Sequence, residues 1–168
     1  STRAYSVLRN QGVIQADRGG QWLRVMPETL INEGTIDANG SNAYLEIGSS
    51  VQTFENTGTL AVNNGGKFYM RSTMSNSGQV AINNGQFYMD GQAATADLGT
   101  VSIAPAGQFL VSGTLDNSGA VLDLPREVYL HAGTITGGRI DCNVVISDSG
   151  WLNGAEVNGT MHLNRNEM

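Results

Sequence analysis

Carboxylates are the side chains of this sequence best suited to chemistry, because a pair of Asp or Glu residues can cleave a glycosidic bond. The acidic residues that come nearest to a cluster are Asp116, Asp123, Asp141 and Asp148. A polysaccharide-processing site would also need basic residues on neighbouring elements, and only Arg126 and Arg139 accompany these acids. We therefore predict no catalytic residues and no enzyme, and we keep a glycan-processing site as the alternative.

Histidine and cysteine are too few and too scattered to predict a metal site. The sequence has two histidines, His131 and His162, and one cysteine, Cys142. Zinc needs three or four ligands, which these residues do not supply. The glycine- and aspartate-rich calcium repeat and the phosphate-binding loop are also missing from the sequence. We predict no metal, no cofactor and no internal disulfide, with Cys142 as a buried, unreactive thiol.

Composition excludes several classes of partner. The net charge is −6 and the chain has a single lysine, Lys67, which argues against nucleic acid and anionic membranes. No apolar stretch is long enough to span a membrane. The chain begins at Ser1 without a signal peptide, which we interpret as a mature product or an excised piece. Apolar residues show no 3.6-residue period, so we expect almost no helix.

An internal repeat organises the chain. The stretch NTGTLAVNNGGKFYM (56–70) matches NSGQVAINNGQFYM (76–89) almost position for position once one glycine is removed. The N-x-G motif recurs at steps of about 20 residues, a period typical of solenoids. Its glycines are Gly12, Gly34, Gly58, Gly78, Gly99, Gly119, Gly138 and Gly159. Apolar residues follow two positions later, at Ile14, Ile36, Leu60, Val80, Val101, Val121, Ile140 and Met161. Asp123 interrupts the next apolar position, which we attribute to a local shift to Leu122 and Leu124.

Each repeat also contains a second alternating run and a third, shorter segment. The apolar pairs of the second run are Leu23/Val25, Leu45/Ile47, Phe68/Met70, Phe87/Met89, Phe109/Val111 and Val128/Leu130. Alternation at period two is typical of strands with one buried face. Repeats of this length cannot bury that face alone and must stack on their neighbours. A sandwich would not repeat its sequence, and a leucine-rich repeat would need a helix and its own signature.

We therefore predict an all-β fold, a parallel β-solenoid of about seven to eight coils with three short strands each. A single domain is expected over residues 1–168, with regular coils over 8–130 and more degenerate, Gly-rich coils over 131–168.

The asparagine at the head of each repeat suits a turn, and asparagines stacked in register can form amide ladders. We predict such a ladder at Asn10, Asn32, Asn56, Asn76, Asp97 and Asn117.

The middle residue of the second run should point outward in every coil. These residues are Arg24, Glu46, Tyr69, Tyr88, Leu110 and Tyr129. Tyr69, Tyr88, Leu110 and Tyr129 would form a strip over four successive coils. Such a strip could contact a glycan or a protein partner, or it could stabilise the wall of the solenoid through stacked rings.

The N-x-G-T units at 32–38, 56–62 and 76–82 resemble the parallel β-helix repeats of secreted bacterial adhesins, both filamentous-haemagglutinin-like proteins and autotransporter passenger regions. The segment 133–163 is similar to degenerate Gly/Thr repeats of very large bacterial surface proteins. This resemblance implies an extracellular or cell-surface location and a structural or adhesive role. Because no capping helix is predicted at either end, we also expect packing, end to end or laterally, against other copies or neighbouring segments of the parent protein. The aromatic strip makes surface glycans a further expected partner. The alternative is a carbohydrate-binding or polysaccharide-processing β-helix.

Overall fold

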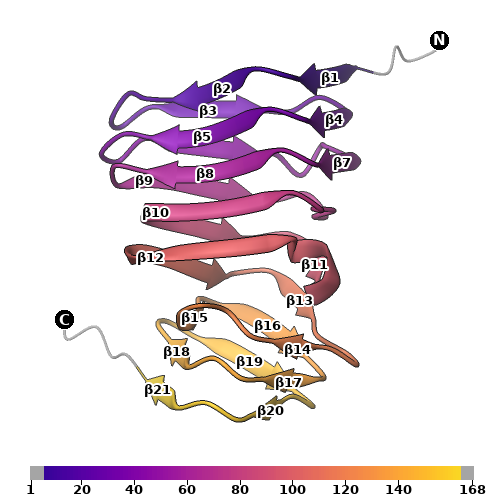
Figure 1. Ribbon diagram of the computed structural model, residues 1–168, viewed down its shortest axis with the longest axis vertical. Helices are drawn as coiled ribbons and strands as arrows, with labels where there is room; N and C mark the ends of the chain where they lie inside the picture. The colour runs from indigo at the N-terminus through magenta and orange to yellow at the C-terminus, as the bar shows by residue number, and fades with distance from the viewer. Residues whose placement is uncertain (1–5, 164–168) are drawn as a thin grey trace.

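The computed structural model describes residues 6–163, and more than half of them lie in parallel strands wound around one axis (Figure 1). Strand makes up 58% of the described residues and helix 3%. Every strand pairing is parallel, and like residues pair with like residues one pass later, for example Asn10 with Asn32 and Phe87 with Phe109. The all-β parallel β-solenoid predicted from the repeat is therefore confirmed.

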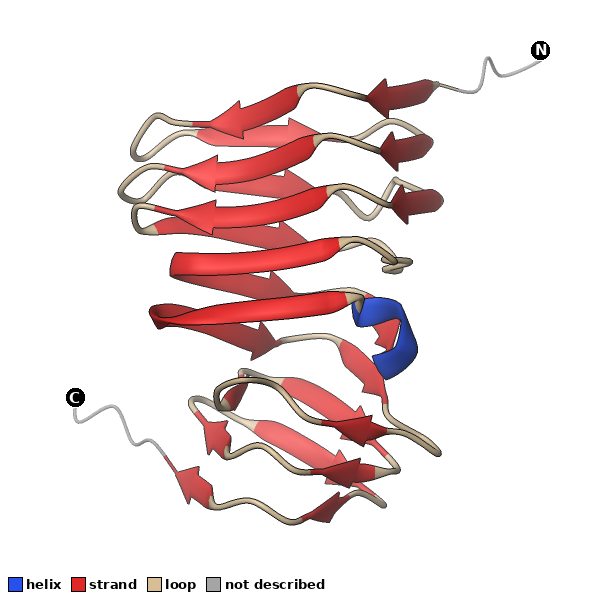
Figure 2. Ribbon diagram, in the orientation of Figure 1, coloured by secondary structure: helices blue, strands red, loops and turns tan. Residues whose placement is uncertain are grey.

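The first three passes of the chain around the axis each contain three short strands, as predicted. They are β1 (Val7–Asn10), β2 (Val13–Ala16) and β3 (Trp22–Val25), then β4 (Thr29–Asn32), β5 (Thr35–Asn39) and β6 (Tyr44–Ile47), then β7 (Thr53–Asn56), β8 (Thr59–Asn63) and β9 (Gly66–Met70). Turns rich in Gly and Asn separate them and change the direction of the chain, which Figure 2 shows as loops between strands.

The fourth and fifth passes depart from three short strands. Their first and second strands merge into β10 (Gln79–Met89) and β12 (Thr100–Val111), while β11 (Gln92–Ala94) and the 3₁₀ helix η1 (Thr95–Leu98) form the remaining wall. Pairing between β10 and β12 shifts register between Ile82 and Asn84. The turn between the first and second strands of earlier passes is replaced here by a register shift inside one continuous strand, because too few residues remain for a separate loop.

The last three passes are shorter. They contain β13 (Thr114–Asp116), β14 (Val121–Leu122), β15 (Val128–Leu130), β16 (Gly133–Thr136), β17 (Arg139–Ile140), β18 (Val144–Ile146), β19 (Gly150–Asn153), β20 (Glu156–Val157) and β21 (Met161–Leu163). On the second-strand wall, Trp22 pairs with Tyr44 near the start of the chain, whereas Val128 pairs with Val144 near its end. The second of these circuits takes fewer residues, so the circumference of the solenoid decreases toward its C-terminal end.

This shortening makes one sequence prediction wrong. The motif at Gly159 predicted that Met161 and Leu163 belong to a first strand. In the structure β21 pairs with β18 and lies on the wall of second strands, while β20 takes the first-strand place beside β17. The shift proposed around Asp123 is correct, because Leu122 and Leu124 are buried and Leu122 pairs with Ile140.

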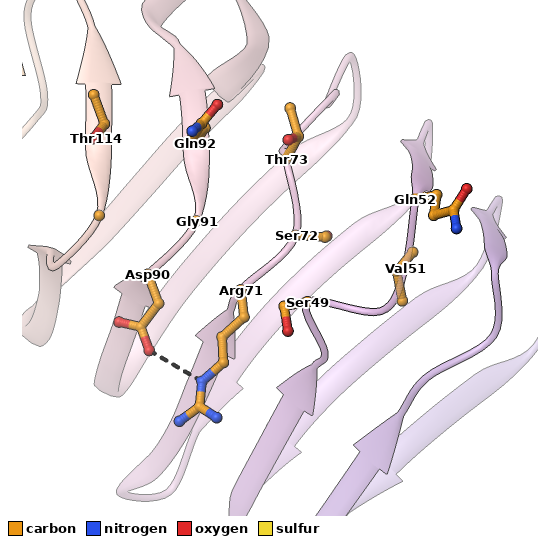
Figure 3. A pocket seen from close by; sticks show the side chains of 11 residues that line it. Ser49, Val51, Gln52, Arg71, Ser72, Thr73, Asp90, Gly91, Gln92 and Thr114 are labelled. Carbon is orange, nitrogen blue, oxygen red and sulfur yellow. Dashed lines mark hydrogen bonds and ion pairs between the residues drawn. The ribbon is translucent and has the colours of Figure 1, made fainter.

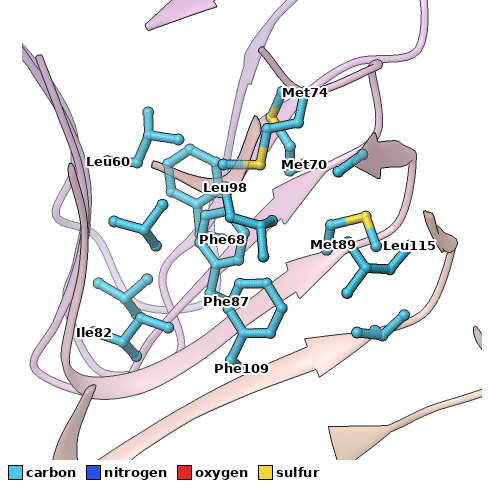
Figure 4. Packing of buried hydrophobic residues seen from close by; sticks show 14 of the residues in the cluster. Leu60, Phe68, Met70, Met74, Ile82, Phe87, Met89, Leu98, Phe109 and Leu115 are labelled. Atoms are coloured by element: carbon cyan, nitrogen blue, oxygen red, sulfur yellow. The ribbon is translucent and has the colours of Figure 1, made fainter. Parts of the chain in front are cut away.

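The core is a column of stacked apolar side chains. Phe68, Phe87 and Phe109 are fully buried, and their ring centroids lie 5.1 and 5.5 Å apart from one pass to the next (Figure 4). Met70 and Met89 fill the space beside them in the same way. The prediction that the apolar pairs of the second strand point inward is confirmed. The residue between the two members of each pair therefore points outward, because side chains alternate along a strand.

One wall of the solenoid is interrupted between β12 and β14. The Met74 amide donates to the Gln92 carbonyl and the Asn76 amide to the Asp97 carbonyl, so a short segment on one pass faces a longer segment on the next. The extra residues form η1. β14 pairs only with β17, and the first half of β12 has β10 as its single neighbour. A cavity of about 230 Å³ separates the two strands.

We expect hydrogen exchange to reveal this interruption. The Thr100 amide donates to Gly78, so the next amide along β12, that of Val101, and likewise that of Ile103, point away from β10 into the interruption. These two amides should exchange at least about tenfold faster than those of Val80 and Ile82, the equivalent residues one pass earlier. Equal protection of the two pairs in an NMR exchange experiment would contradict the open edge.

Candidate functional site

The predicted asparagine ladder exists in the first four passes. The Nδ2 group of Asn10 donates to Oδ1 of Asn32 at 2.7 Å, Asn32 donates to Asn56, and Asn56 donates to Asn76 at 2.6 Å. All four side chains are buried. The same amides also bond within their own turn, for example Asn56 Nδ2 to the Gly58 carbonyl at 3.1 Å. The ladder therefore satisfies the polar groups of a buried corner.

The ladder ends at η1, so the prediction for Asp97 is wrong. Asn76 Nδ2 donates to the Leu98 carbonyl at 2.6 Å, in place of the Asp97 side chain. In the next pass the side chain of Asn117 accepts from Thr95 Oγ1 at 2.8 Å and donates to the carbonyls of Gly137 and Arg139. A 3₁₀ helix moves the turn residue outward, which the spacing of glycines could not reveal.

At three successive N-x-G motifs, those of Gly34, Gly58 and Gly78, the glycine is required by the close stacking of backbones. A Cβ atom on Gly34 would lie 2.2 Å from the carbonyl oxygen of Gly12, and one on Gly58 would lie 2.1 Å from that of Gly34. The same contact recurs at Gly78. Only glycine lets adjacent passes approach this closely.

The predicted strip lies on the outer face of the second-strand wall, in the predicted register. Glu46, Tyr69, Tyr88, Leu110 and Tyr129 are paired in that order. The rings of Tyr69 and Tyr88 stack with centroids 4.6 Å apart and planes at 9°. Leu110 is only 4% exposed, because it is a short side chain set between two tyrosines. Within the strip Tyr69 and Tyr88 therefore form a stacked pair, and Leu110 separates this pair from Tyr129.

A second aromatic column, which the sequence analysis missed, lies beside this strip. Trp22 and Tyr44 stack at 4.7 Å and 11°, and Trp22 also lies 5.3 Å from Tyr69. The available signal was the spacing of Trp22 and Tyr44 in the sequence, which equals the step from Gly12 to Gly34. Arg24 lies over the Trp22 ring and Lys67 over the Tyr44 ring at 5.2 and 5.6 Å, so cations occupy part of the remaining ring surface.

A charge network borders the same wall. Glu46 is 6% exposed and contacts Arg24 at 3.3 Å and Arg71 at 3.2 Å. Arg71 in turn contacts Asp90 at 3.4 Å and lies over the Tyr69 ring at 5.6 Å. The two guanidinium groups compensate the charge of the buried Glu46 carboxylate. His131 packs edge-on against Tyr88 at 5.9 Å, and His162 is exposed on β21.

Stability should fall at alkaline pH through these tyrosines. Burial, with the neighbouring Tyr88 next in effect, raises the pKa of Tyr69 to about 12, and burial also raises the pKa of Tyr88 and of Tyr129. Unfolded tyrosine ionises near pH 10. A raised folded pKa stabilises the fold below pH 10, and this contribution is lost as the pH rises from about 10 to about 12. Tyrosinate absorbance should therefore rise together with unfolding; ionisation at pH 10 in a folded chain would contradict this.

The acidic residues separate into three places. Asp123 and Asp141 lie on successive passes and line one cleft of about 330 Å³ with Arg126 and Glu127. Asp116 is elsewhere, where hydrogen bonds from Ser118 lower the pKa of its carboxyl group, and Asp148 is exposed between β18 and β19.

Asp141 is already engaged by its own strand neighbours. Arg139 Nε lies 2.8 Å from one carboxylate oxygen of Asp141 and Nη2 lies 2.8 Å from the other. Asn158 Nδ2 approaches the first oxygen at 3.4 Å. The structure thus brings two acidic residues and a basic residue, Arg126, into one cleft, as a polysaccharide-processing site would require. One of the two acids, Asp141, is however held in a two-point ion pair with Arg139.

Cys142 is one of the residues that line this cleft, and it is buried as predicted, with 8% of its surface exposed. Burial raises the pKa of its thiol, which keeps the reactive thiolate scarce at neutral pH. We expect a thiol reagent to label the native chain at least about a hundredfold more slowly than the unfolded chain. Equal rates would show that the last passes open freely.

A further cleft was not predicted from the sequence. It has a volume of about 460 Å³ and follows the corner between the second-strand wall and the wall of β7, β11 and β13 (Figure 3). One side carries Arg71 and Asp90, joined by an ion pair, and the other carries Gln52, Thr73, Gln92 and Thr114 in a row. Ser72 and Gly91 lie between these sides (Figure 3). Four adjacent passes contribute to it, so no local motif could reveal it.

Over residues 6–163 there is no group of three or more His, Cys, Asp or Glu placed to hold a metal ion. Within the same residues no helix has the length and apolar character needed to cross a membrane. Comparison with protein-family models, curated proteins and solved structures found no match to this chain.

Proposed function

We propose that this chain is a non-catalytic structural and adhesive module of a bacterial cell-surface or secreted protein, acting outside the cell. The observation that supports this best is the in-register repetition of side-chain contacts along the axis. Buried amides bond from pass to pass, and rings stack from pass to pass. A chain stiffened in this way suits a rod that presents surfaces at a distance.

The aromatic strip favours the wall-stabilising role. Stacking occupies the ring faces that a sugar would otherwise cover, and the hydroxyl groups of Tyr88 and Tyr129 already donate to Gln86 and Glu127 at 2.9 Å. We expect Tyr88→Ser to lower the free energy of unfolding by about 0.5–1.5 kcal/mol, the usual range for an aromatic pair, and to leave self-association and binding to cell-envelope glycans unchanged. Lost association with unchanged stability would instead make the strip the contact surface.

The ends of the described solenoid support packing against further segments of a parent protein. Val13 is 67% exposed on β2, and Trp151 and Leu163 are 60% and 73% exposed on the last pass. The first circuit, from Trp22 to Tyr44, is longer than the last, from Val144 to Met161. Identical copies stacked head to tail would match poorly. Neighbouring segments of a parent protein therefore suit these ends better than a second copy does. Lateral contact between copies is a separate proposal, which sedimentation over a range of concentrations tests.

A polysaccharide-processing solenoid is the second candidate, because Asp123 and Asp141 line one cleft with Arg126. Incubation with acidic and neutral polysaccharides, assayed for reducing ends and unsaturated products, separates the two functions. Turnover that disappears in Asp123→Asn and Asp141→Asn, but persists in the Asp116→Asn control, would replace the proposed function. We expect no turnover.

A further inference from the structure

The corner cleft between Arg71–Asp90 and the row Gln52, Thr73, Gln92 and Thr114 is built by glycine. A Cβ atom on Gly91 would lie 2.1 Å from the Ser72 carbonyl oxygen, and one on Gly113 would lie 1.9 Å from that of Gly91. The stacking of backbones thus forbids side chains along the floor on these passes. Longer side chains rise on both sides, so a groove runs parallel to the solenoid axis (Figure 3).

The groove has hydrogen-bonding groups but no spare charge. Arg71 is balanced by Asp90 and Glu46, which contact it at 3.4 and 3.2 Å. Most other lining side chains are hydroxyls and amides, and the apolar member, Val51, is only 3% exposed. An anionic ligand would meet no free cation, and a lipid or an apolar peptide would cover little apolar surface. The lining instead suits an uncharged ligand with many hydroxyl groups.

The Arg71 side chain is already positioned to donate hydrogen bonds to such a ligand. Its guanidinium lies over the Tyr69 ring at 5.6 Å and is fixed by two carboxylates. A guanidinium has five N–H donors, and these contacts engage only some of them. Gln92 and Thr114, on two successive passes, face it across the floor (Figure 3). Donors fixed before binding lower the entropy cost of association.

We propose that this groove binds a neutral, linear oligosaccharide laid along the solenoid axis. The three steps between the four passes that line it span about 14 Å, at about 4.8 Å for each step. Hydroxyl groups of the sugar bond to Gln92, Thr73 and Thr114 on one side and to Arg71 on the other. The proposal assigns a class of ligand to the adhesive module. It rests on the proposed non-catalytic function in one respect, which is that the bound sugar is not cleaved.

The experiment uses the whole chain and the neutral hexasaccharides of mannose, glucose (α- and β-linked) and N-acetylglucosamine, with oligogalacturonate and heparin fragments as charged probes. We expect at least one neutral probe to shift the NMR amide signals of Ser72, Gly91 and Gly113. Gln92→Ala and Arg71→Met should each weaken that binding by at least about tenfold. Gln79→Ala, an exposed glutamine on another wall, is the matched control and should bind normally.

No shift of the groove amides with any neutral probe up to about 10 mM would overturn the proposal, since the dissociation constant would then lie above about 10 mM. Shifts with the charged probes alone, or equal weakening by Gln79→Ala, would overturn it too. Release of reducing ends from a bound probe would overturn the non-catalytic function and leave the groove as the binding site, so the two failures are distinguishable.

Discussion

Gly58→Ala should destabilise the solenoid by about 3 kcal/mol and lower the melting temperature by roughly 6–12 °C. The added Cβ would lie 2.1 Å from the Gly34 carbonyl oxygen and 2.8 Å from the Glu33 carbonyl carbon. Both are backbone atoms of the preceding pass, so no rotamer change relieves the contact. The two passes would have to separate, and ladder hydrogen bonds on both sides would lengthen. Thermal and denaturant unfolding measure the effect.

Gly12→Ala is the matched control, because Gly12 holds the same place in the first N-x-G motif and a Cβ there meets no atom within 4 Å. Its φ lies outside the left-handed region, so alanine fits the backbone. We expect a change of at most about 0.5 kcal/mol. An equal loss of stability in the two variants would show that these positions need glycine for its backbone flexibility and not because adjacent passes approach closely.

Asn56→Ala should cost a similar amount, about 3 kcal/mol, through unsatisfied polar groups. Asn56 is 1% exposed, accepts from Asn32 and donates to Asn76 and to the Gly58 carbonyl. Alanine leaves these partners buried without water to replace the bond. Because Asn56 lies in the middle of the ladder, two other amides lose a partner at once. Calorimetry or denaturant unfolding gives the free energy.

Asn83→Ala removes the same kind of hydrogen bond between two asparagine side chains, but at a solvent-exposed position. Asn83 Nδ2 donates to Asn63 Oδ1 at 2.8 Å, and this pair is exposed, so water can take its place. We expect a loss below about 0.5 kcal/mol. Asn10→Ala, at the end of the buried ladder, should fall between the two, because one asparagine loses a partner. A uniform cost across the three variants would refute the role assigned to burial.

The N-x-G repeat predicted the architecture because every structural element it encodes recurs one pass later in the same environment. Phe68 and Phe87, or Tyr69 and Tyr88, occupy equivalent positions and pair directly. Period-two alternation then determines which of them is buried, since a strand has two opposite faces. The buried series, the outward strip and the ladder from Asn10 to Asn76 could therefore be predicted without coordinates.

The predictions failed where the length of a pass changes. η1 inserts residues before Leu98 and displaces Asp97, and the contracted last pass moves Met161 to another wall. A count of residues between glycines does not tell where in the circuit an insertion or deletion lies. Only stacking against the neighbouring pass decides this, because the ladder hydrogen bonds and the buried face must be kept together.

The sequence by itself determined the solenoid, its inward and outward faces and the residues that repeat along its axis, because these depend on local periodicity. Only the tertiary structure decided which side chains from different walls meet. Arg71 and Asp90 on one wall, and Gln92 and Thr114 on the next, carry no repeat signal of their own. They form a groove because a corner brings two walls together and because backbones stacked too closely for a Cβ leave its floor bare.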